Sequence, residues 1–287
     1  MRPSEKRFAQ TTHPILIAPA PPFQPNPFPS SGEPSCPAPS SASRSETAAT
    51  TPYQSKIGGT PYLPKNARYP HHTEKKHPLT LAAQINFAEV PHLPGFPEHG
   101  ILQVFIDGLS YNMGWDFDNQ SLQAGWRIVY YPELLPESEL QTDFSAYQAA
   151  DSDCLPFSGE FPLIFQTASE EEKDADFKTL EGHKIGGCPI FIKGDPFWEY
   201  HEGIDFNDPA AYSDWQKYIL LLQLDSDINE NDRYTGKLMW GDSGVANSSS
   251  RPKTWSNAIS AARPLCLIAI KTSGQPHFQT ASDTKAV

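Results

Sequence analysis

The sequence predicts an α+β protein with predominantly antiparallel sheets, built from internally duplicated turn-strand units in a single domain. Short apolar runs rich in Ile, Val, Tyr and Phe, which favour strands, are separated by Gly, Pro and Asn. Two parts of the chain nearly repeat each other, which indicates an internal duplication. The strands also follow one another too closely for regular βαβ crossovers, which favours antiparallel pairing.

A Gly-Gly turn opens each of the two repeated units. The sequence KIGGTPY at 56–62 matches KIGGCPI at 184–190, and paired glycines permit the positive φ of a tight turn. Further along, 79–86 is echoed by 219–225, and 100–107 by 236–242, in the same order. Gln84 and Gln223 take equivalent places in the two units, and a buried amide that joins strands explains both without a ligand.

The elements follow in chain order. The predicted strands are Leu81–Phe87, Ile101–Ile106, Trp126–Tyr131, Ile190–Lys193, Leu220–Asp225 and Lys237–Trp240. Glu170–Leu180 is expected to form an exposed charged helix or loop, and Pro209–Tyr218 a short helix capped by Asp208. These helical segments are the reason for an α+β class.

The two ends of the chain differ in composition from the predicted domain at 51–247. Residues 1–50 hold 11 of the 29 prolines beside many Ser, Ala and Thr residues, so we expect them to be disordered or out of frame. No apolar run is long enough to span a membrane, and prolines interrupt the N-terminal apolar stretch. The four cysteines have no C-x-x-C spacing and suit reduced thiols. We therefore expect a cytoplasmic protein.

The charge of the chain bears on its partners. The formal net charge of −12 disfavours binding to nucleic acid, because that affinity comes largely from Lys and Arg neutralising phosphates. A macromolecular partner is expected to be a basic protein. The alternative is that acidity only keeps the protein soluble.

Four residues near the end of the second unit are candidate binding residues. Asp225 and Asp227 follow a buried strand, where clustered carboxylates could hold Ca²⁺ or simply form a solvated acidic loop. The EF-hand pattern fails here, so no metal site is predicted. Trp240 and Asp242 end another strand and could line a groove, although core packing and a turn hydrogen bond explain them as well.

Other motifs do not supply catalytic chemistry. The five histidines between His71 and His99 lack the spacing of metal ligands, and the turn around Ser243 lacks the full G-x-S-x-G pattern of a nucleophile elbow. No catalytic residue and no cofactor is predicted.

Several motifs occur in the order of a known family. They lie at 55–64, 81–91, 93–97, 184–187, 221–227 and 239–247. With these motifs the chain resembles the YwqG-like family of uncharacterised bacterial proteins. The resemblance implies a single α+β domain. No activity is established for that family, so it implies no catalytic residues.

The chain departs from this family after Asn247. Family members continue with a pattern such as F-F-I-x-P-E-D-L, whereas this chain continues with three serines. Restoring one base in a coding sequence that fits residues 248–271 yields the family pattern followed by a stop codon. The sequence thus predicts that residues 248–287 are a frameshifted, non-native tail. The alternative is a divergent C-terminal tail.

Acidity, missing catalytic spacing and family context together favour a non-enzymatic interaction protein, such as an immunity-type inhibitor, for a basic partner. The alternative is an enzyme or ligand-binding domain that uses a carboxylate cluster at the interface of the repeats.

Overall fold

The described part of the chain forms one ten-stranded sheet in which all pairings are antiparallel. This computed structural model describes residues 15–19, 50–116, 122–147, 154–167, 182–187, 189–190, 219–227, 238–241, 243–250 and 265–269. Its strands are β1 (Ile15–Pro19), β2 (Lys56–Gly58), β3 (Thr80–Asn86), β4 (Ile101–Ile106), β5 (Trp126–Tyr131), β6 (Glu160–Thr167), β7 (His183–Ile185), β8 (Ile219–Asp225), β9 (Val245–Ser250) and β10 (Leu265–Ala269).

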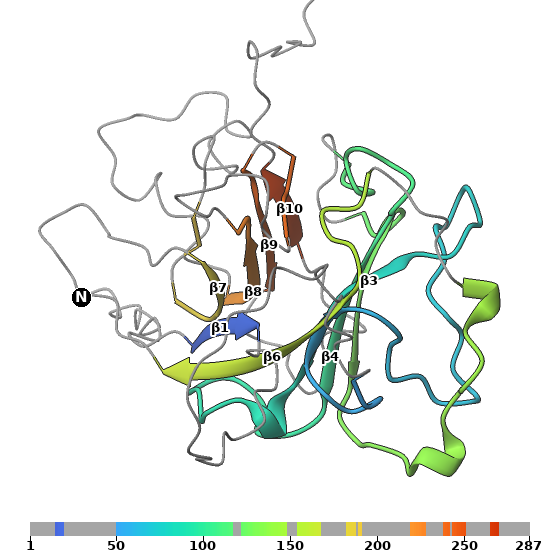
Figure 1. Ribbon diagram of the computed structural model, residues 1–287, viewed down its shortest axis with the longest axis horizontal. Helices are drawn as coiled ribbons and strands as arrows, with labels where there is room; N and C mark the ends of the chain where they lie inside the picture. Colours follow the sequence, from blue (N-terminus) through green and yellow to red (C-terminus); the bar gives the residue numbers. More distant parts are fainter. Residues whose placement is uncertain are drawn as a thin grey trace, which may run out of the picture.

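The order of the strands divides the sheet into two similar wings (Figure 1). Across the sheet the order is β10-β9-β8-β7-β1-β6-β2-β3-β4-β5. We call β2 to β5 the first wing and β7 to β10 the second wing. The antiparallel pair of β1 and β6 joins them at the centre. Each wing therefore attaches through its shortest strand, β2 or β7, to one strand of the central pair.

The predicted α+β class is wrong, because the protein is β-rich. Within the described residues the only helical elements are three short 3₁₀ turns, η1 (Phe87–Glu89), η2 (Glu137–Glu139) and η3 (Ser145–Tyr147). The helices predicted at 170–180 and 209–218 lie outside the described residues. Most residues of the described main core come from strands. None of the described helices is long or apolar enough to cross a membrane.

The register of strand pairing demonstrates the duplication. Lys56 pairs with Gln84, which pairs with Gln103, and in the second wing Lys184 pairs with Gln223, which pairs with Asn247. In each wing the second strand carries an irregularity at the same place, between Leu81 and Ala83 in β3 and between Leu220 and Leu222 in β8. Bulges of this kind are specific features of a strand pair. The two wings are thus copies of one four-stranded unit.

The third pair of matching segments predicted from the sequence, 100–107 and 236–242, is misaligned. The segment at 236–242 was matched to β4, but pairing with β8 shows that β9 is the counterpart of β4. The predicted strand Lys237–Trp240 reduces, in its described residues, to a single bridge between Leu238 and Phe157. Ile190 lies outside any strand, and 191–193 are not described. The error arose because a shared Gly-Asp pattern resembles a repeat, whereas only strand pairing decides equivalence.

The Gly-Gly turns that open the units have the predicted backbone. Gly58 and Gly59 have φ of 67° and 72°, and Gly186 and Gly187 have φ of 73° and 69°. A Cβ atom on Gly58 would lie 2.3 Å from the carbonyl oxygen of Gly159. Side chains are therefore excluded at this turn by both conformation and space.

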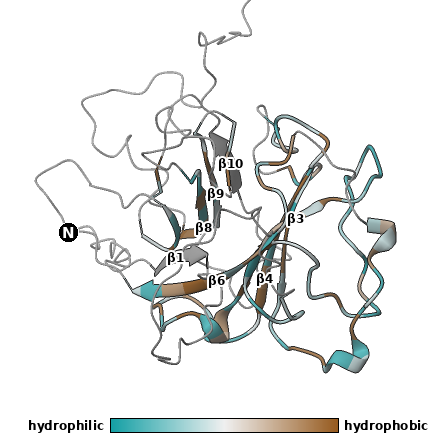
Figure 2. Ribbon diagram, viewed as in Figure 1, coloured by the Kyte–Doolittle hydropathy of each residue, from teal (hydrophilic) through white to brown (hydrophobic). Residues whose placement is uncertain are grey.

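The main core lies between the two wings. It contains Leu102, Val104 and Ile106 of β4 together with Leu221, Leu222 and Leu224 of β8. Figure 2 shows hydrophobic residues on β4 and β6. The intervening residues of β4 face the other way, where Phe105 packs with Leu63, Tyr69, Leu79 and Leu81 beneath the loops of the first wing. The sheet must therefore curl so that its wings share one core.

Three serines occupy the second wing where the first wing has large apolar residues. By strand pairing, Ser248, Ser249 and Ser250 correspond to Val104, Phe105 and Ile106. All three serines are buried, at 5%, 6% and 7% exposure. A small cavity between the wings is lined by Ala82, Val104 and Ile106 on one side and by Leu222, Trp240 and Ser248 on the other. At these positions of the described strands, the second wing therefore presents smaller side chains than the first.

The terminal segments contribute strands to the sheet. Within residues 1–50, predicted to lack structure, Ile15–Pro19 forms β1 at the centre of the sheet. Beyond the predicted domain end at Asn247, β9 continues to Ser250 and pairs with β8, while Leu265–Ala269 forms β10 and pairs with β9. The other residues of 1–49 and 251–287 lie outside the described residues. Their reading frame stays a prediction.

The cavity yields a test of stability. Ser248→Thr adds one methyl group beside the cavity and keeps the hydroxyl, so we expect the free energy of unfolding to rise by about 1 kcal/mol. Urea denaturation of the full chain measures it. Ser249→Thr is the matched control, because it adds the same group to the same strand at a position that does not line this cavity. An equal gain in both variants would assign the effect to strand propensity instead of cavity filling.

Candidate functional site

The predicted carboxylates Asp225 and Asp227 lie at the end of β8 and are occupied by internal contacts. Asp225 accepts hydrogen bonds from the backbone N–H of Gly182 at 2.8 Å and of Ser226 at 2.8 Å. Asp227 accepts from the backbone N–H of Leu238 at 3.1 Å. Its other oxygen lies 3.2 Å from Nε2 of His183.

His183 links these two aspartates. It is buried in β7, and its Nδ1 accepts the backbone N–H of Asp225 at 3.0 Å while its Nε2 faces Asp227. Because Nδ1 is an acceptor, the neutral ring carries its proton on Nε2 and donates it to Asp227. The two carboxylates therefore join β7, β8 and the segment at Leu238.

Trp240 is the one of the other two predicted residues that the structure describes. Trp240 is buried at 1% exposure, its backbone N–H donates to Oγ of Ser226 at 2.9 Å, and its indole lines the cavity between the wings. Its Nε1–H has no hydrogen-bond partner among the described residues. Asp242 lies outside the described residues. The described part of the predicted site thus serves the packing of the second wing.

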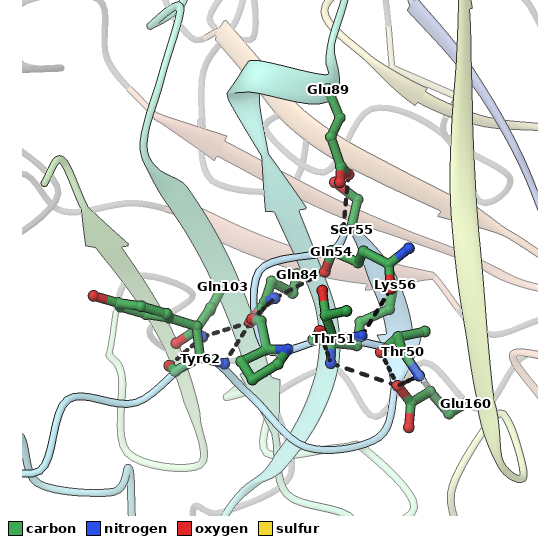
Figure 3. Close-up of polar contacts among 11 residues, drawn as sticks. Thr50, Thr51, Gln54, Ser55, Lys56, Tyr62, Gln84, Glu89, Gln103 and Glu160 are labelled. Atoms are coloured by element: carbon green, nitrogen blue, oxygen red, sulfur yellow. Dashed lines mark hydrogen bonds and ion pairs between the residues drawn. The ribbon is translucent and has the colours of Figure 1, made fainter. Parts of the chain in front are cut away.

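A buried amide network occupies the outer face of the first wing (Figure 3). The side-chain oxygen of Gln84 accepts the backbone N–H of Tyr62 at 2.7 Å, and its Nε2 donates to the carbonyls of Pro52 and Gln54 at 2.8 Å each. Gln103 donates to the carbonyl of Tyr62 at 2.7 Å and to Gln84 Oε1 at 2.8 Å. The network ties an irregular segment to two strands.

The second wing repeats this network. Gln223 accepts the backbone N–H of Ile190 at 2.8 Å and donates to the carbonyl of Gly182 at 2.8 Å, and Asn247 donates to the carbonyl of Ile190 at 2.8 Å. Two buried acceptors also correspond, since neither Oε1 of Gln103 nor Oδ1 of Asn247 has a hydrogen-bond partner among the described residues. The prediction that buried amides join the strands is confirmed.

Lys56 is a buried cation beside the first network (Figure 3). Its Nζ donates to the carbonyl of Thr51 at 3.1 Å and lies 3.5 Å from a carboxylate oxygen of Glu160. Burial lowers the pKa of Lys56 below its usual value, although the nearby charge of Glu160 opposes this shift. Glu160 also accepts from the backbone N–H of Thr50 at 3.1 Å, so the pair attaches residues 50–51 to β6.

Asp107 forms a separate polar centre, immediately after β4. It is fully buried, and one oxygen accepts from the backbone N–H of Leu109 at 3.0 Å and from Nε2 of His77 at 2.8 Å. Its second oxygen lies 3.3 Å from Nζ of Lys75 and 3.8 Å from Nε2 of His72. Asp107 therefore connects the end of β4 to the turn at 72–77.

The electrostatics of this centre keep Asp107 charged. Burial alone would raise the pKa of Asp107, but the hydrogen bonds from Leu109 and His77 outweigh it, and the pKa lies below the usual 3.8. Burial lowers the pKa of His72 below 6.5, against the attraction of Asp107. Nδ1 of His72 accepts the backbone N–H groups of Glu74 and Lys75 at 3.2 Å each, which requires an unprotonated Nδ1.

Sequence reasoning missed the Asp107 centre. In the sequence, the histidines between His71 and His99 suggest only a metal site, and their spacing does not support one. Asp107 comes from a different element 30 residues beyond His77, so only the fold brings them together. No group of three or more His, Cys, Asp or Glu side chains in the described residues is arranged to hold a metal ion.

The connection from β4 to β5 begins at Asp107 and presents apolar side chains to solvent. Leu109 is 52% exposed and Tyr111 is 79% exposed. Between them and β5, Met113 is buried in the main core at 3% exposure. This geometry can hold a short exposed turn rigidly, with Asp107 and Met113 as its anchors.

Comparison with known proteins places the chain in a family. Residues 55–257 match the family described as Domain of unknown function (DUF1963). The chain belongs to the DUF1963 family. No curated protein matches the sequence. The matched residues of this DUF1963 domain include the side-chain amides of both networks and the Asp107 centre. The match extends beyond Asn247 into the residues that follow β9.

The amide network of the DUF1963 domain predicts a large effect of Gln84→Leu. The substitution leaves the buried N–H of Tyr62 and two carbonyls without their partner, so we expect a loss of about 2 kcal/mol or more in the free energy of unfolding. Chemical denaturation measures it. Gln141→Leu removes only one exposed hydrogen bond and should change stability by less than about 0.5 kcal/mol. Similar losses in both variants would contradict a special role for the buried amide.

The Asp107 centre predicts a pH dependence of stability. Because the pKa of His72 is lower in the folded than in the unfolded chain, the unfolded chain binds more protons below pH 6.5, and stability should fall as the pH drops through this window. The charged or titratable groups that act on His72 are Asp107, Lys75, His77 and Glu74.

His72→Asn tests this dependence. The Asn Oδ1 can accept the two backbone N–H groups that Nδ1 accepts, but it does not take up a proton. We expect a shallower fall of the melting temperature below pH 6.5 than in the natural chain. His99→Asn, at an exposed position, should leave the profile unchanged. An unaltered profile for His72→Asn would show that His72 does not link protons to folding.

Proposed function

We propose that this DUF1963 protein is a non-enzymatic interaction protein whose partner is a basic protein. An immunity-type inhibitor, which binds and neutralises another protein, is one form of this function. We also propose that the chain is a YwqG-like protein of bacterial origin that acts in the cytoplasm. The ordered motifs that resemble that family support its placement.

The hydrogen bonds that the candidate carboxylates accept are the main support for the proposal. The alternative function, an enzyme or ligand-binding domain, requires carboxylates that converge on a substrate. Asp225 and Asp227 instead accept hydrogen bonds from Gly182, Ser226 and Leu238 within the fold. Their acceptor capacity is directed to the backbone, which favours a structural use.

The net charge supports the choice of partner. A chain with a formal net charge of −12 attracts cationic surfaces and repels anionic ones at distances up to the Debye length, about 8 Å at physiological ionic strength. Charge of one sign accelerates association with an oppositely charged protein. A basic partner is therefore favoured over an acidic protein or a nucleic acid.

The proposal predicts a salt-sensitive complex. With the tagged full-length chain as bait in an extract of its native cells, we expect one basic protein in stoichiometric amount. Raising the salt from about 0.05 M to about 0.5 M should weaken the purified complex, because screening shortens the range of charge attraction. An unrelated acidic bait of similar net charge is the control for unspecific ion exchange. Recovery of only acidic proteins, or of the same proteins on both baits, would contradict the proposal.

A further inference from the structure

Exposed apolar side chains concentrate on the connection between β4 and β5. Five large hydrophobic side chains in the described residues are strongly exposed, and three of them, Leu109, Tyr111 and Leu122, belong to this connection. The other two are Leu134 at 37% and Ile164 at 39% exposure, each on a different element. Single exposed apolar residues are ordinary on protein surfaces, but a local concentration marks an interaction site.

Hydrogen bonds define the turn that displays Leu109 and Tyr111. The backbone N–H of Asp107 donates to the carbonyl of Met113 at 3.2 Å, and the N–H of Met113 donates to the carbonyl of Ser110 at 2.8 Å. Ser110 donates back to the carbonyl of Asp107 at 3.3 Å, and the carboxylate of Asp107 accepts the N–H of Leu109 at 3.0 Å. Hydrogen bonds therefore join the two ends of the turn, Asp107 and Met113, to each other and to Ser110 at its middle.

Close packing fixes the far end of the same turn. Met113 has a φ of 54°, which side chains rarely adopt, and Gly114 follows with a φ of 83°. A Cβ atom on Gly114 would lie 1.9 Å from the carbonyl oxygen of Gly125. The buried side chain of Met113 anchors the turn in the core. A residue in the left-handed region persists only where the surrounding structure determines it, and the close approach of Gly114 to Gly125 supplies such a constraint.

A rigid turn with exposed apolar side chains is suited to recognition. Fixing the turn in advance reduces the conformational entropy that binding would otherwise remove. Tyr is enriched among the side chains that contribute most to protein interfaces. The hydrogen bonds explain the backbone and Asp107. In the part of the chain that the structure describes, the exposed ring of Tyr111 and the methyl groups of Leu109 take no part in those bonds.

We propose that the turn from Asp107 to Met113 is the docking surface for the basic partner, with Leu109 and Tyr111 as its apolar anchors. This inference rests on the proposed function. The sequence from Asp107 to Gly125 contains no Lys or Arg, and Asp116 adds an acidic group beside the turn. The nearby charge of Lys75 is directed to Asp107. A second copy of the chain carries the same net charge of −12 and is disfavoured as the occupant.

Position-specific crosslinking in the full-length chain tests where the partner binds. A benzophenone amino acid is placed at Tyr111 in one variant and at Leu134, a comparably apolar surface position, in another. Under ultraviolet light in native cells we expect one basic protein to be crosslinked from position 111 and not from position 134. A basic protein crosslinked only from position 134 would overturn the docking surface and leave the proposed function standing.

Affinity measurements with the crosslinked protein, once purified, test the anchors. The double variant Leu109→Ser, Tyr111→Ser should bind it at least about tenfold more weakly, whereas Leu134→Ser should bind within about twofold of the natural chain. Tyr111→Phe keeps the ring and should retain most of the affinity. An unchanged melting temperature shows that the double variant is folded. Equal affinity of the double variant and the natural chain would overturn the anchors.

The remaining outcomes separate the two proposals. A crosslink from position 111 to a second copy of the chain, with a dimer in light scattering that the double variant abolishes, would overturn the basic partner as the occupant. If no adduct forms at either position and the bait recovers no basic protein, both the docking surface and the proposed function fail.

Discussion

The buried amides of the two wings control the register on which the rest of the structure depends. Gln84 and Gln223 each lie at the middle of a three-strand pairing, and each accepts a backbone N–H from outside the strands, that of Tyr62 or of Ile190. A shift by one residue would bury apolar side chains on the wrong face and leave these amides unpaired. The strand irregularity takes the same position relative to these amides in β3 and in β8.

Duplication also explains how the core is shared. The irregularity directs two successive residues of β3 and of β8 into the main core. These are Ala82 and Ala83 in the first wing and Leu221 and Leu222 in the second. Small residues of one wing thus face larger residues of the other. The balance is lost at β9, where the buried Ser248 and Ser250 stand at the positions of Val104 and Ile106. The cavity beside Ser248 is the physical consequence, since close-packed interiors tolerate few voids.

The Asp107 centre belongs to the first wing and gives it a feature beyond the shared scaffold. A charged carboxylate without exposure needs several donors, and it obtains them from Leu109, His77 and Lys75. Those donors connect two loops that the sheet alone would leave independent. The burial of this one charge therefore orders the turn after β4. The exposed side chains on that turn are attached to a backbone whose conformational entropy is already reduced.

The sequence alone determined the strands β3, β4, β5 and β8, the Gly-Gly turns and the existence of a duplication, because period, strand-forming residues and glycine pairs are local signals. It could also place Gln84 and Gln223 as equivalents. The α+β class and the match of 236–242 to β4 are wrong. A binding site at Asp225, Asp227, Trp240 and Asp242 stays a prediction, and Asp242 lies outside the described residues. Only the tertiary structure decided that β9 is the partner of β4, that Asp225 and Asp227 bond to backbone groups, and that Asp107 meets His77. Each of these depends on which distant segments pair in the sheet, and pairing is set by the free energy of the whole core rather than by any local pattern.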